Sequence, residues 1–142
     1  MKNKIEILLY GHLYKKMCEK YMLSIRERYD LRQVDLEIMY LLYSAGDNNT
    51  ARDIGSSHLF TKGHISQSVG RLEQRKLIDV VSDEQDRRCT HLRLTSDADC
   101  IVKEIIEARK QMYDVIFEGI TDEEQRILGR IINKIEANML KQ

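Results

Sequence analysis

The chain has 142 residues, which suits a single domain with one hydrophobic core. Its 23 Lys and Arg residues balance 23 Asp and Glu residues, so the overall charge does not by itself indicate a nucleic-acid partner. Three cysteines without paired spacing exclude a disulfide framework and a zinc finger. The sequence has neither a long apolar run nor a signal-like N-terminus, so we expect a cytoplasmic protein with no membrane partner.

Helical periodicity dominates the first half of the chain, and the complete lack of proline favours uninterrupted helices. Apolar residues spaced three and four apart predict four successive helices, over residues 4–29, 34–45, 50–57 and 61–75. Gly46 is expected to end the second helix, and Thr50 with Asp53 predicts a capping box at the start of the third. The third and fourth helices are joined by a short connection, which is typical of a helix-turn-helix.

The periodicity changes after the fourth helix. Residues 77–81 (LIDVV) and 90–95 (THLRLT) are expected to form two strands around the charged turn SDEQDRRC, and together they predict a β-hairpin. A helical pattern returns after Ser96, and Thr121 with Glu124 predicts a capping box for a last helix. The expected fold is mainly α with a small β-wing, in the order α-α-α-α-β-β-α-α.

The fourth helix is the candidate element for reading DNA. Burial of its apolar stripe turns a small, polar and cationic face outward. The apolar stripe is Ile65, Val69 and Leu72, and the outward set is Lys62, Gly63, Ser66, Gln67, Gly70 and Arg71, with His64 at the border. Gln pairs with adenine and Arg or Lys with guanine in the major groove, and Thr61 with the helix N-terminus can bind phosphate. For this helix alone, a solvated face without function is an equal alternative.

The hairpin tip adds a second candidate contact. Arg87 and Arg88 gain little there as structure, because surface ion pairs contribute only ~0–1 kcal/mol. Beside a reading helix, an arginine at the tip can enter a minor groove, and Asp86 is positioned to orient one guanidinium. Residues 58–78 also form a modest basic island, with four Lys or Arg residues against Glu73.

Residues 31–98 resemble the MarR family (multiple antibiotic resistance regulators), and the helix order extends the resemblance to nearly the whole chain. The resemblance is carried by ARDIGSSHLFTKGHISQSVGRLEQRKLI and by DEQDRRCTHLRLT, in which Asp86-Arg87-Arg88 and the later Leu94-Thr95 match the wing signature. Two positions depart from the family pattern, because Lys76 and Ala98 stand where glycine is frequent.

The resemblance implies a homodimer held by the first and the last two helices, with a recognition helix in the major groove and Arg88 in the minor groove. We therefore expect one MarR-type domain over 1–142, with 31–95 as the DNA-binding lobe and 1–30 and 96–142 as the dimerisation region. The expected function is sequence-specific transcriptional regulation at a pseudo-palindromic operator in double-stranded DNA, as a repressor released by a small-molecule effector. The alternatives are a winged-helix module that binds protein instead of DNA, which the neutral net charge favours, and a thiol redox-sensing regulator.

Members of the resembled family bind small aromatic effectors between the DNA head and the dimer base. Adaptable Met and Tyr side chains in the first two helices suit such a pocket. The candidate pocket residues are Tyr10, Tyr14, Met17, Tyr21, Met39 and Tyr43.

Catalysis, cofactors and metal ions are not expected. The four histidines are scattered, and neither a nucleophile motif nor a phosphate-binding glycine loop is present. Leu8 stands where the peroxide-sensing branch of the family has cysteine, so Cys18 is expected to be a half-buried structural thiol. Cys89 follows the wing arginines and is expected to be a tolerated small residue, with redox activity as the alternative for either thiol.

Overall fold

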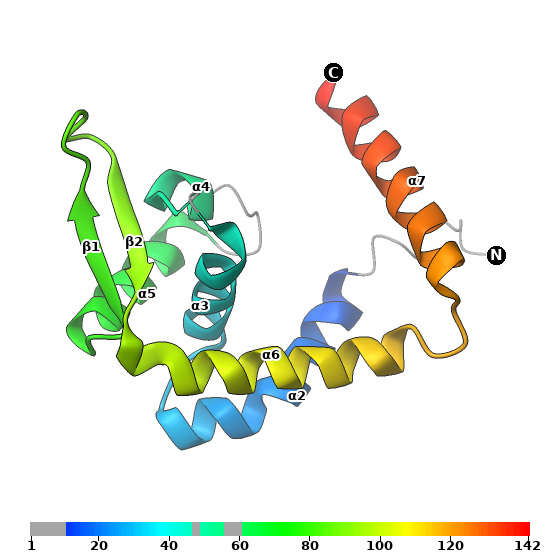
Figure 1. Ribbon diagram of the computed structural model, residues 1–142, viewed down its shortest axis with the longest axis horizontal. Coiled ribbons are helices and arrows are strands. Elements are labelled where there is room, and N and C mark those ends of the chain that lie inside the picture. Colours follow the sequence, from blue (N-terminus) through cyan, green and yellow to red (C-terminus); the bar gives the residue numbers. More distant parts are fainter. Residues whose placement is uncertain (1–10, 47–48, 56–60) are drawn as a thin grey trace. The chain divides into compact units, whose positions relative to one another are not determined.

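The computed structural model describes residues 11–46, 49–55 and 61–142 (Figure 1). The chain divides into two compact units, Met1–Lys110 and Gln111–Gln142, and each is described by itself. Residues 4–10 of the predicted first helix, and Tyr10 with them, lie outside the described residues. No helix in the described part of the chain combines the length and the apolar character that crossing a membrane requires.

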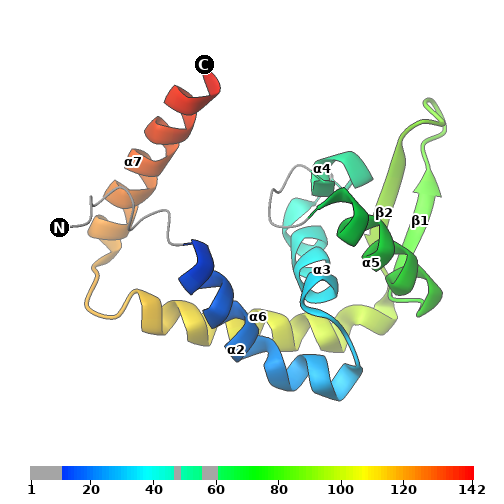
Figure 2. The same cartoon turned by 180° about the vertical axis from the view of Figure 1, so that it is seen from behind.

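The order of elements confirms the predicted mainly α fold with a small β-wing (Figures 1 and 2). The elements are α2 (Gly11–Tyr29), α3 (Gln33–Ala45), α4 (Ala51–Gly55), α5 (Lys62–Gln74), β1 (Ile78–Ser82), β2 (Thr90–Leu94), the 3-10 turn η1 (Ser96–Ala98), α6 (Asp99–Ile116) and α7 (Asp122–Leu140). Helix α3 is central to the first unit, where it contacts α2, α4, α5 and β2.

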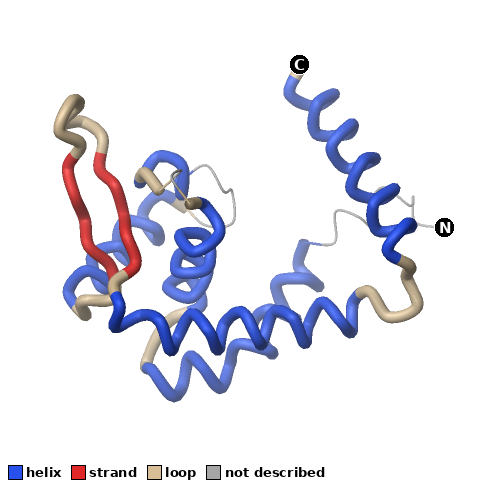
Figure 3. Tube along the Cα trace, in the orientation of Figure 1, coloured by secondary structure: helices blue, strands red, loops and turns tan. Residues whose placement is uncertain are grey.

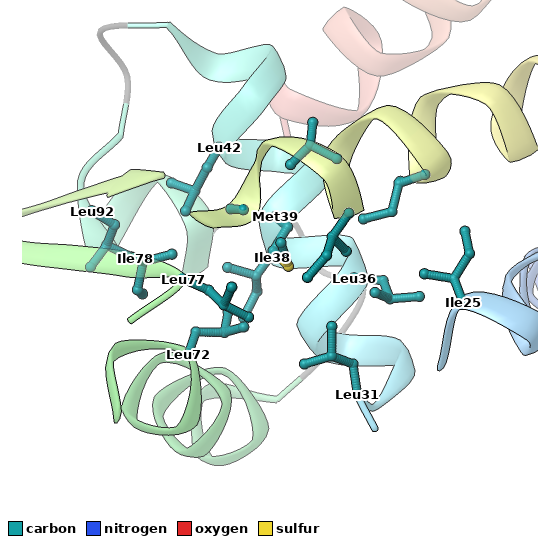
Figure 4. Packing of buried hydrophobic residues seen from close by; sticks show 14 of the residues in the cluster. Ile25, Leu31, Leu36, Ile38, Met39, Leu42, Leu72, Leu77, Ile78 and Leu92 are labelled. Atoms are coloured by element: carbon teal, nitrogen blue, oxygen red, sulfur yellow. The ribbon is translucent and has the colours of Figure 1, made fainter. Parts of the chain in front are cut away.

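One hydrophobic core joins the helices and the hairpin of the first unit (Figure 4). Large side chains such as Leu36, Met39, Leu72 and Leu92 are at most 1% exposed, and each buried aliphatic side chain of this size contributes about 1.5–3 kcal/mol. The core also includes Met22 and Ile25 of α2 and Ile101, Val102 and Ile105 of α6. Helices α2 and α6 therefore bury apolar residues in the same core as residues 31–95, the predicted DNA-binding lobe.

Helix ends follow the predicted capping signals. Gly46 has φ +56° directly after α3, a conformation that glycine adopts without strain. The backbone N–H of Asp53 donates to Thr50 Oγ1 at 3.1 Å, and the N–H of Thr50 donates to Asp53 Oδ2 at 3.3 Å. Thr121 and Glu124 make the same reciprocal pair at the start of α7. Both predicted capping boxes are confirmed.

Lys76 ends α5 in a backbone conformation that usually favours glycine. Its φ is +61°, its N–H donates to the carbonyl of Glu73 at 3.0 Å, and the N–H of Leu77 donates to the carbonyl of Leu72 at 2.9 Å. These two bonds form a Schellman motif, and Thr95 Oγ1 donates to the Lys76 carbonyl at 2.6 Å. The turn at which the resembled family often has glycine is therefore made here with a lysine.

The wing is an antiparallel pair of strands with a long loop between them (Figure 3). Its register pairs Ile78 with Leu94 and Ser82 with Thr90. A short segment before α4 joins the sheet as well, because Thr50 bridges His91 and the N–H of Leu92 donates to the carbonyl of Asn49 at 2.8 Å. Sequence analysis missed this third segment, since two residues beside a turn carry no detectable periodicity.

The second unit contains the end of α6 and all of α7. None of the 19 residues of α7 is buried. Ile127, Ile131 and Met139 are 40%, 46% and 62% exposed, although their spacing places them on one helix face. An apolar helix face of this extent is unusual on the surface of a monomeric protein.

Candidate nucleic-acid interface

Helix α5 presents the polar face that its periodicity predicts. Ile65 and Leu72 are 6% and 0% exposed and anchor the helix in the core. Thr61 is the N-cap, with its Oγ1 accepting from the N–H of His64 at 3.3 Å. The predicted contact residues that are exposed are Thr61, Lys62, Gly63, His64, Ser66 and Gln67.

Arg71 has a different task from the predicted one. Its Nη2 donates to Oδ1 of Asp35 at 2.8 Å, and the Asp35 side chain is only 2% exposed. The hydroxyl of Ser68, which is fully buried, donates to the same oxygen, while Asp35 Oδ2 accepts from the N–H of Arg32 at 2.9 Å. A buried carboxylate requires such partners. The guanidinium of Arg71 thus holds α5 against α3 and is not directed at base edges.

Arg75 is also engaged within the protein. Its two terminal nitrogens donate to the carbonyl oxygens of Asp30 and Tyr29, at 2.7 and 2.6 Å. They thus provide hydrogen-bond donors for backbone carbonyls that have no partner within the helix at the end of α2. Two of the four cations of the basic island predicted over 58–78 therefore also have structural roles, although Arg75 keeps its full charge because its partners are neutral carbonyls. Lys62 and Lys76 retain exposed side chains at the two ends of α5.

Two glycines on α5 are not required by packing. A Cβ atom added at Gly70 would meet no described atom within 4 Å, and one added at Gly63 would meet only Thr61 Oγ1, at 4.0 Å. Glycine in a helix interior costs roughly 0.8–1 kcal/mol relative to alanine. The space that they leave lies on the outside of the helix, where a groove floor or a phosphate backbone can approach closely.

The wing tip presents both predicted arginines to solvent, since Arg87 and Arg88 are exposed. Asp86 orients the tip through the backbone and not through a guanidinium, because its Oδ1 accepts from the N–H of Arg88 at 3.0 Å. Asp83 braces the start of the loop by accepting from the N–H of Gln85 at 2.8 Å. Hydrogen bonds from His91 and from the loop backbone hold the pKa of Asp83 below its usual range.

The candidate effector residues occupy unlike environments. Tyr14, Met17 and Tyr21 are half-buried on α2, whereas Met39 is completely buried in the core and Tyr43 is 57% exposed. They therefore differ in how accessible each of them is to an effector from solvent.

A buried charged cluster lies between α2, α3 and α6, and no sequence pattern predicted it. The Nη2 of Arg109 donates to Tyr14 Oη at 3.1 Å, its Nη1 lies 3.4 Å from Glu37 Oε2, and the guanidinium stacks 3.7 Å from the centre of the Tyr40 ring. Its members come from helices distant in the sequence, so periodicity gives no signal for it.

The described cysteines differ in exposure. Cys18 is 4% exposed, and burial together with the nearby carboxylate of Glu37 raises the pKa of its thiol. A thiol with a raised pKa is a poor nucleophile and a poor target for peroxide. This environment agrees with the structural role expected for Cys18, while Cys89 is half-buried and Cys100 is exposed.

Comparisons with known proteins agree with this geometry. A family model described as a winged helix DNA-binding domain matches residues 31–98. YsmB, an HTH-type transcriptional regulator of Bacillus subtilis, is 28% identical over 98 residues, which cover 69% of this chain and 66% of YsmB.

Solved structures share the fold across almost the entire chain. MepR of S. aureus in its DNA-binding conformation has a TM-score of 0.79 at 19% identity, covering 98% of this chain and 99% of MepR. A MarR transcriptional regulator from Methanosarcina mazei has a TM-score of 0.74 at 17% identity, with the same coverage. The matched winged-helix region, the exposed face of α5 and the arginine-tipped wing together identify the chain as a DNA-binding transcriptional regulator with a winged helix domain, and its fold is shared with a MarR transcriptional regulator.

Proposed function

We propose that this protein is a cytoplasmic, homodimeric repressor without catalytic activity. It binds a pseudo-palindromic operator in double-stranded DNA and is released from it by a small-molecule effector. In the proposed complex, the two copies of α5 enter successive major grooves. The wing arginines reach the flanking minor grooves, whose negative potential attracts guanidinium groups.

The observation that carries this proposal is the exposed face of α5. Thr61 and Lys62 lie at its N-terminus, where free backbone N–H groups favour phosphate. Gln67 is exposed one and a half turns later, with the chemistry to pair with an adenine edge. Because Arg71 is held by Asp35, the proposed base-specific contacts of α5 rest mainly on Gln67 and Lys62.

The proposed dimer is supported by the second unit. Helix α7 has an apolar face, including Ile127, Ile131 and Met139, with no buried residue. A second copy of the chain would cover this face by a two-fold arrangement, the commonest symmetry of soluble oligomers. Light scattering at micromolar concentration is expected to give a dimeric mass, and a monomeric mass would contradict this part of the proposal.

Binding to the DNA that adjoins the protein's own gene tests the function directly. Footprinting is expected to protect two half-sites about 10 base pairs apart, one helical turn. The affinity should fall steeply with salt, because phosphate contacts release counterions. A single asymmetric half-site, or affinity that does not depend on salt, would count against the proposed complex.

The alternative of a protein-binding module draws support from the neutral net charge and from the structural use of Arg71 and Arg75. If no duplex from the neighbouring promoter binds at low salt, this alternative replaces the DNA-binding proposal.

The redox alternative has less support, since Cys18 is buried and its thiol pKa is raised. For the effector, the half-buried Tyr14, Met17 and Tyr21 on α2 remain the proposed contacts.

A further inference from the structure

Three side chains with metal-binding chemistry meet where the wing loop joins the two strands. The strand pairing of Ser82 with Thr90 continues for one more residue, because the N–H of Asp83 donates to the carbonyl of Cys89 at 2.9 Å. Side chains alternate between the two faces of a hairpin. Asp83, Cys89 and His91 therefore project from the same face, two of them directly opposite each other and the third diagonal to Asp83.

The distances among these groups are those of a compact cluster. Nε2 of His91 lies 3.0 Å from Oδ2 of Asp83, and ligand atoms of Asp83, Cys89 and His91 all lie within 4.8 Å of one another. The Asp83 and His91 side chains are 32% and 25% exposed, so the cluster is half-buried yet open to an ion from solvent.

A hydrogen bond at the other ring nitrogen fixes the orientation of the His91 imidazole. Nδ1 of His91 lies 2.7 Å from Oδ1 of Asn49. Asn49 is itself fixed to β2, because its carbonyl accepts from the N–H of Leu92 at 2.8 Å. With Nδ1 donating to Asn49, Nε2 is the ring nitrogen that can bind a metal ion once the proton that it donates to Asp83 has been released. A hydrogen bond from the far ring nitrogen to an oxygen is the usual support of a metal-ligating histidine.

We propose that Asp83, Cys89 and His91 form a three-residue site for Zn²⁺ where the wing loop joins the two strands. Thiolate, imidazole and carboxylate are the ligands of protein zinc, with bonds of about 2.0–2.3 Å, so neighbouring ligand atoms lie roughly 3.3–3.7 Å apart in a tetrahedron. The separation of 3.0 Å between His91 and Asp83 is slightly shorter than this range, and no separation among the three ligand atoms exceeds 4.8 Å, so small side-chain movements suffice to place an ion. Three protein ligands leave the fourth position to water, and binding releases the Cys89 thiol proton and the Nε2 proton of His91 to solvent.

Zinc at this place would tie the two ends of the wing loop together. Asp83 and Cys89 flank the loop that carries Arg87 and Arg88. Fixing both ends restricts the loop before DNA arrives, which lowers the entropic cost of ordering it on DNA. This consequence rests on the proposed DNA-binding function, whereas the zinc site itself does not.

Titration of the chelator-treated, reduced protein with Co²⁺, a spectroscopic substitute for zinc, tests the site without DNA. We expect one Co²⁺ per chain, thiolate-to-cobalt charge transfer in the near ultraviolet, strong visible bands of a four-coordinate ion, and loss of both when Zn²⁺ is added. Cys89→Ser should abolish the charge transfer, while Cys100→Ser, which alters an exposed thiol on α6, should leave the spectrum unchanged.

Two further variants distinguish metal ligation from a contact between Asp83 and His91 that has only a structural role. Asp83→Asn should lower the Co²⁺ affinity and alter the visible bands. Asn49→Ala should lower the affinity by about 10- to 100-fold without changing the charge-transfer band, as loss of a supporting hydrogen bond does. Circular dichroism checks that each variant is folded. Absence of charge transfer in the wild-type protein, or its persistence in Cys89→Ser, would overturn the site and leave Asp83 and His91 as a hydrogen-bonded pair alone.

The DNA arm of the test uses the same metal-free and zinc-loaded samples on an operator duplex. Zinc is expected to raise the affinity on the order of fivefold, within the usual range for coupled sites, and Cys89→Ser should remove the difference. If the metal-free and zinc-loaded proteins bind DNA equally well and the cobalt spectrum is intact, zinc binding is not coupled to DNA binding, but the metal site stands. Failure of both samples to bind DNA would overturn the proposed function, and the cobalt titration would still decide the site.

Discussion

The guanidinium of Arg71 lies 2.8 Å from the carboxylate of Asp35, and this buried ion pair joins the recognition helix to α3. Asp35 accepts two further hydrogen bonds, from the hydroxyl of Ser68 and from the backbone N–H of Arg32. The orientation of α5, and with it the direction of its exposed face, depends on this buried carboxylate.

Arg71→Ala is expected to lower the free energy of unfolding by about 1–3 kcal/mol, because it leaves the buried Asp35 short of one charged partner. The cost stays below that of an isolated buried charge, since Ser68 and Arg32 still donate to Asp35. Chemical denaturation measures it, with Gln67→Ala on the exposed face as the matched control, expected within about 0.5 kcal/mol of wild type. If Arg71→Ala is as stable as Gln67→Ala, the ion pair does not hold α5.

Gly70→Ala is expected to change stability and DNA affinity in opposite directions. A Cβ atom at this position meets no described atom within 4 Å, so the variant should gain roughly 0.8–1 kcal/mol of helix stability. The same methyl group would stand between α5 and the groove and should weaken DNA binding. Thermal unfolding and fluorescence anisotropy measure the two effects. Unchanged affinity in a stabilised variant would show that Gly70 does not face DNA.

Lys76→Gly is expected to stabilise the protein by about 1 kcal/mol, because Lys76 has φ +61°, where a side chain is strained. Lys76→Ala is the matched control, since it removes the charge but keeps the Cβ atom. Only the glycine variant should raise the midpoint of chemical denaturation. Equal stabilisation by alanine would assign the effect to the charge and not to the backbone.

An organic hydroperoxide is expected to leave DNA binding largely unchanged. Cys18 is buried, and its raised thiol pKa keeps the reactive thiolate scarce at neutral pH. In a timed alkylation followed by mass spectrometry, the exposed Cys100 should react before Cys18. Release of DNA by stoichiometric peroxide that is lost in Cys18→Ser would make this protein a thiol sensor.

Local signals in the sequence predicted most of the fold. The periodicity of Ile65 and Leu72 placed the buried side of α5, and Thr121 with Glu124 placed the start of α7, because both patterns depend on residues within a few positions of each other. Ser68 was not recognised as buried, because its partner Asp35 lies 33 residues away on another helix. A polar residue on the buried side of a helix is explained only once that partner is known.

Dependence on residues distant in the sequence also separates the predicted from the unpredicted parts of the DNA interface and of the proposed zinc site. The exposed set around Gln67 follows from one helix and was predicted, whereas Arg71 was misassigned because its exposure depends on Asp35. The cluster of Asp83, Cys89 and His91 depends on the strand register, and its support from Asn49 depends on a segment before α4. Neither relationship is expressed in sequence spacing.

A salt titration of DNA affinity for wild type, Gln67→Ala and Arg88→Ala, on operator and scrambled duplexes, tests whether α5 and the wing bind DNA. Arg88→Ala should weaken binding to both duplexes nearly alike and reduce the salt slope by about one unit, because the minor groove carries a degenerate pattern. Gln67→Ala should cost ~1–3 kcal/mol on the operator alone and relax the preference at one position of each half-site. If neither variant changes affinity or slope, α5 and the wing do not bind DNA, and the account is contradicted.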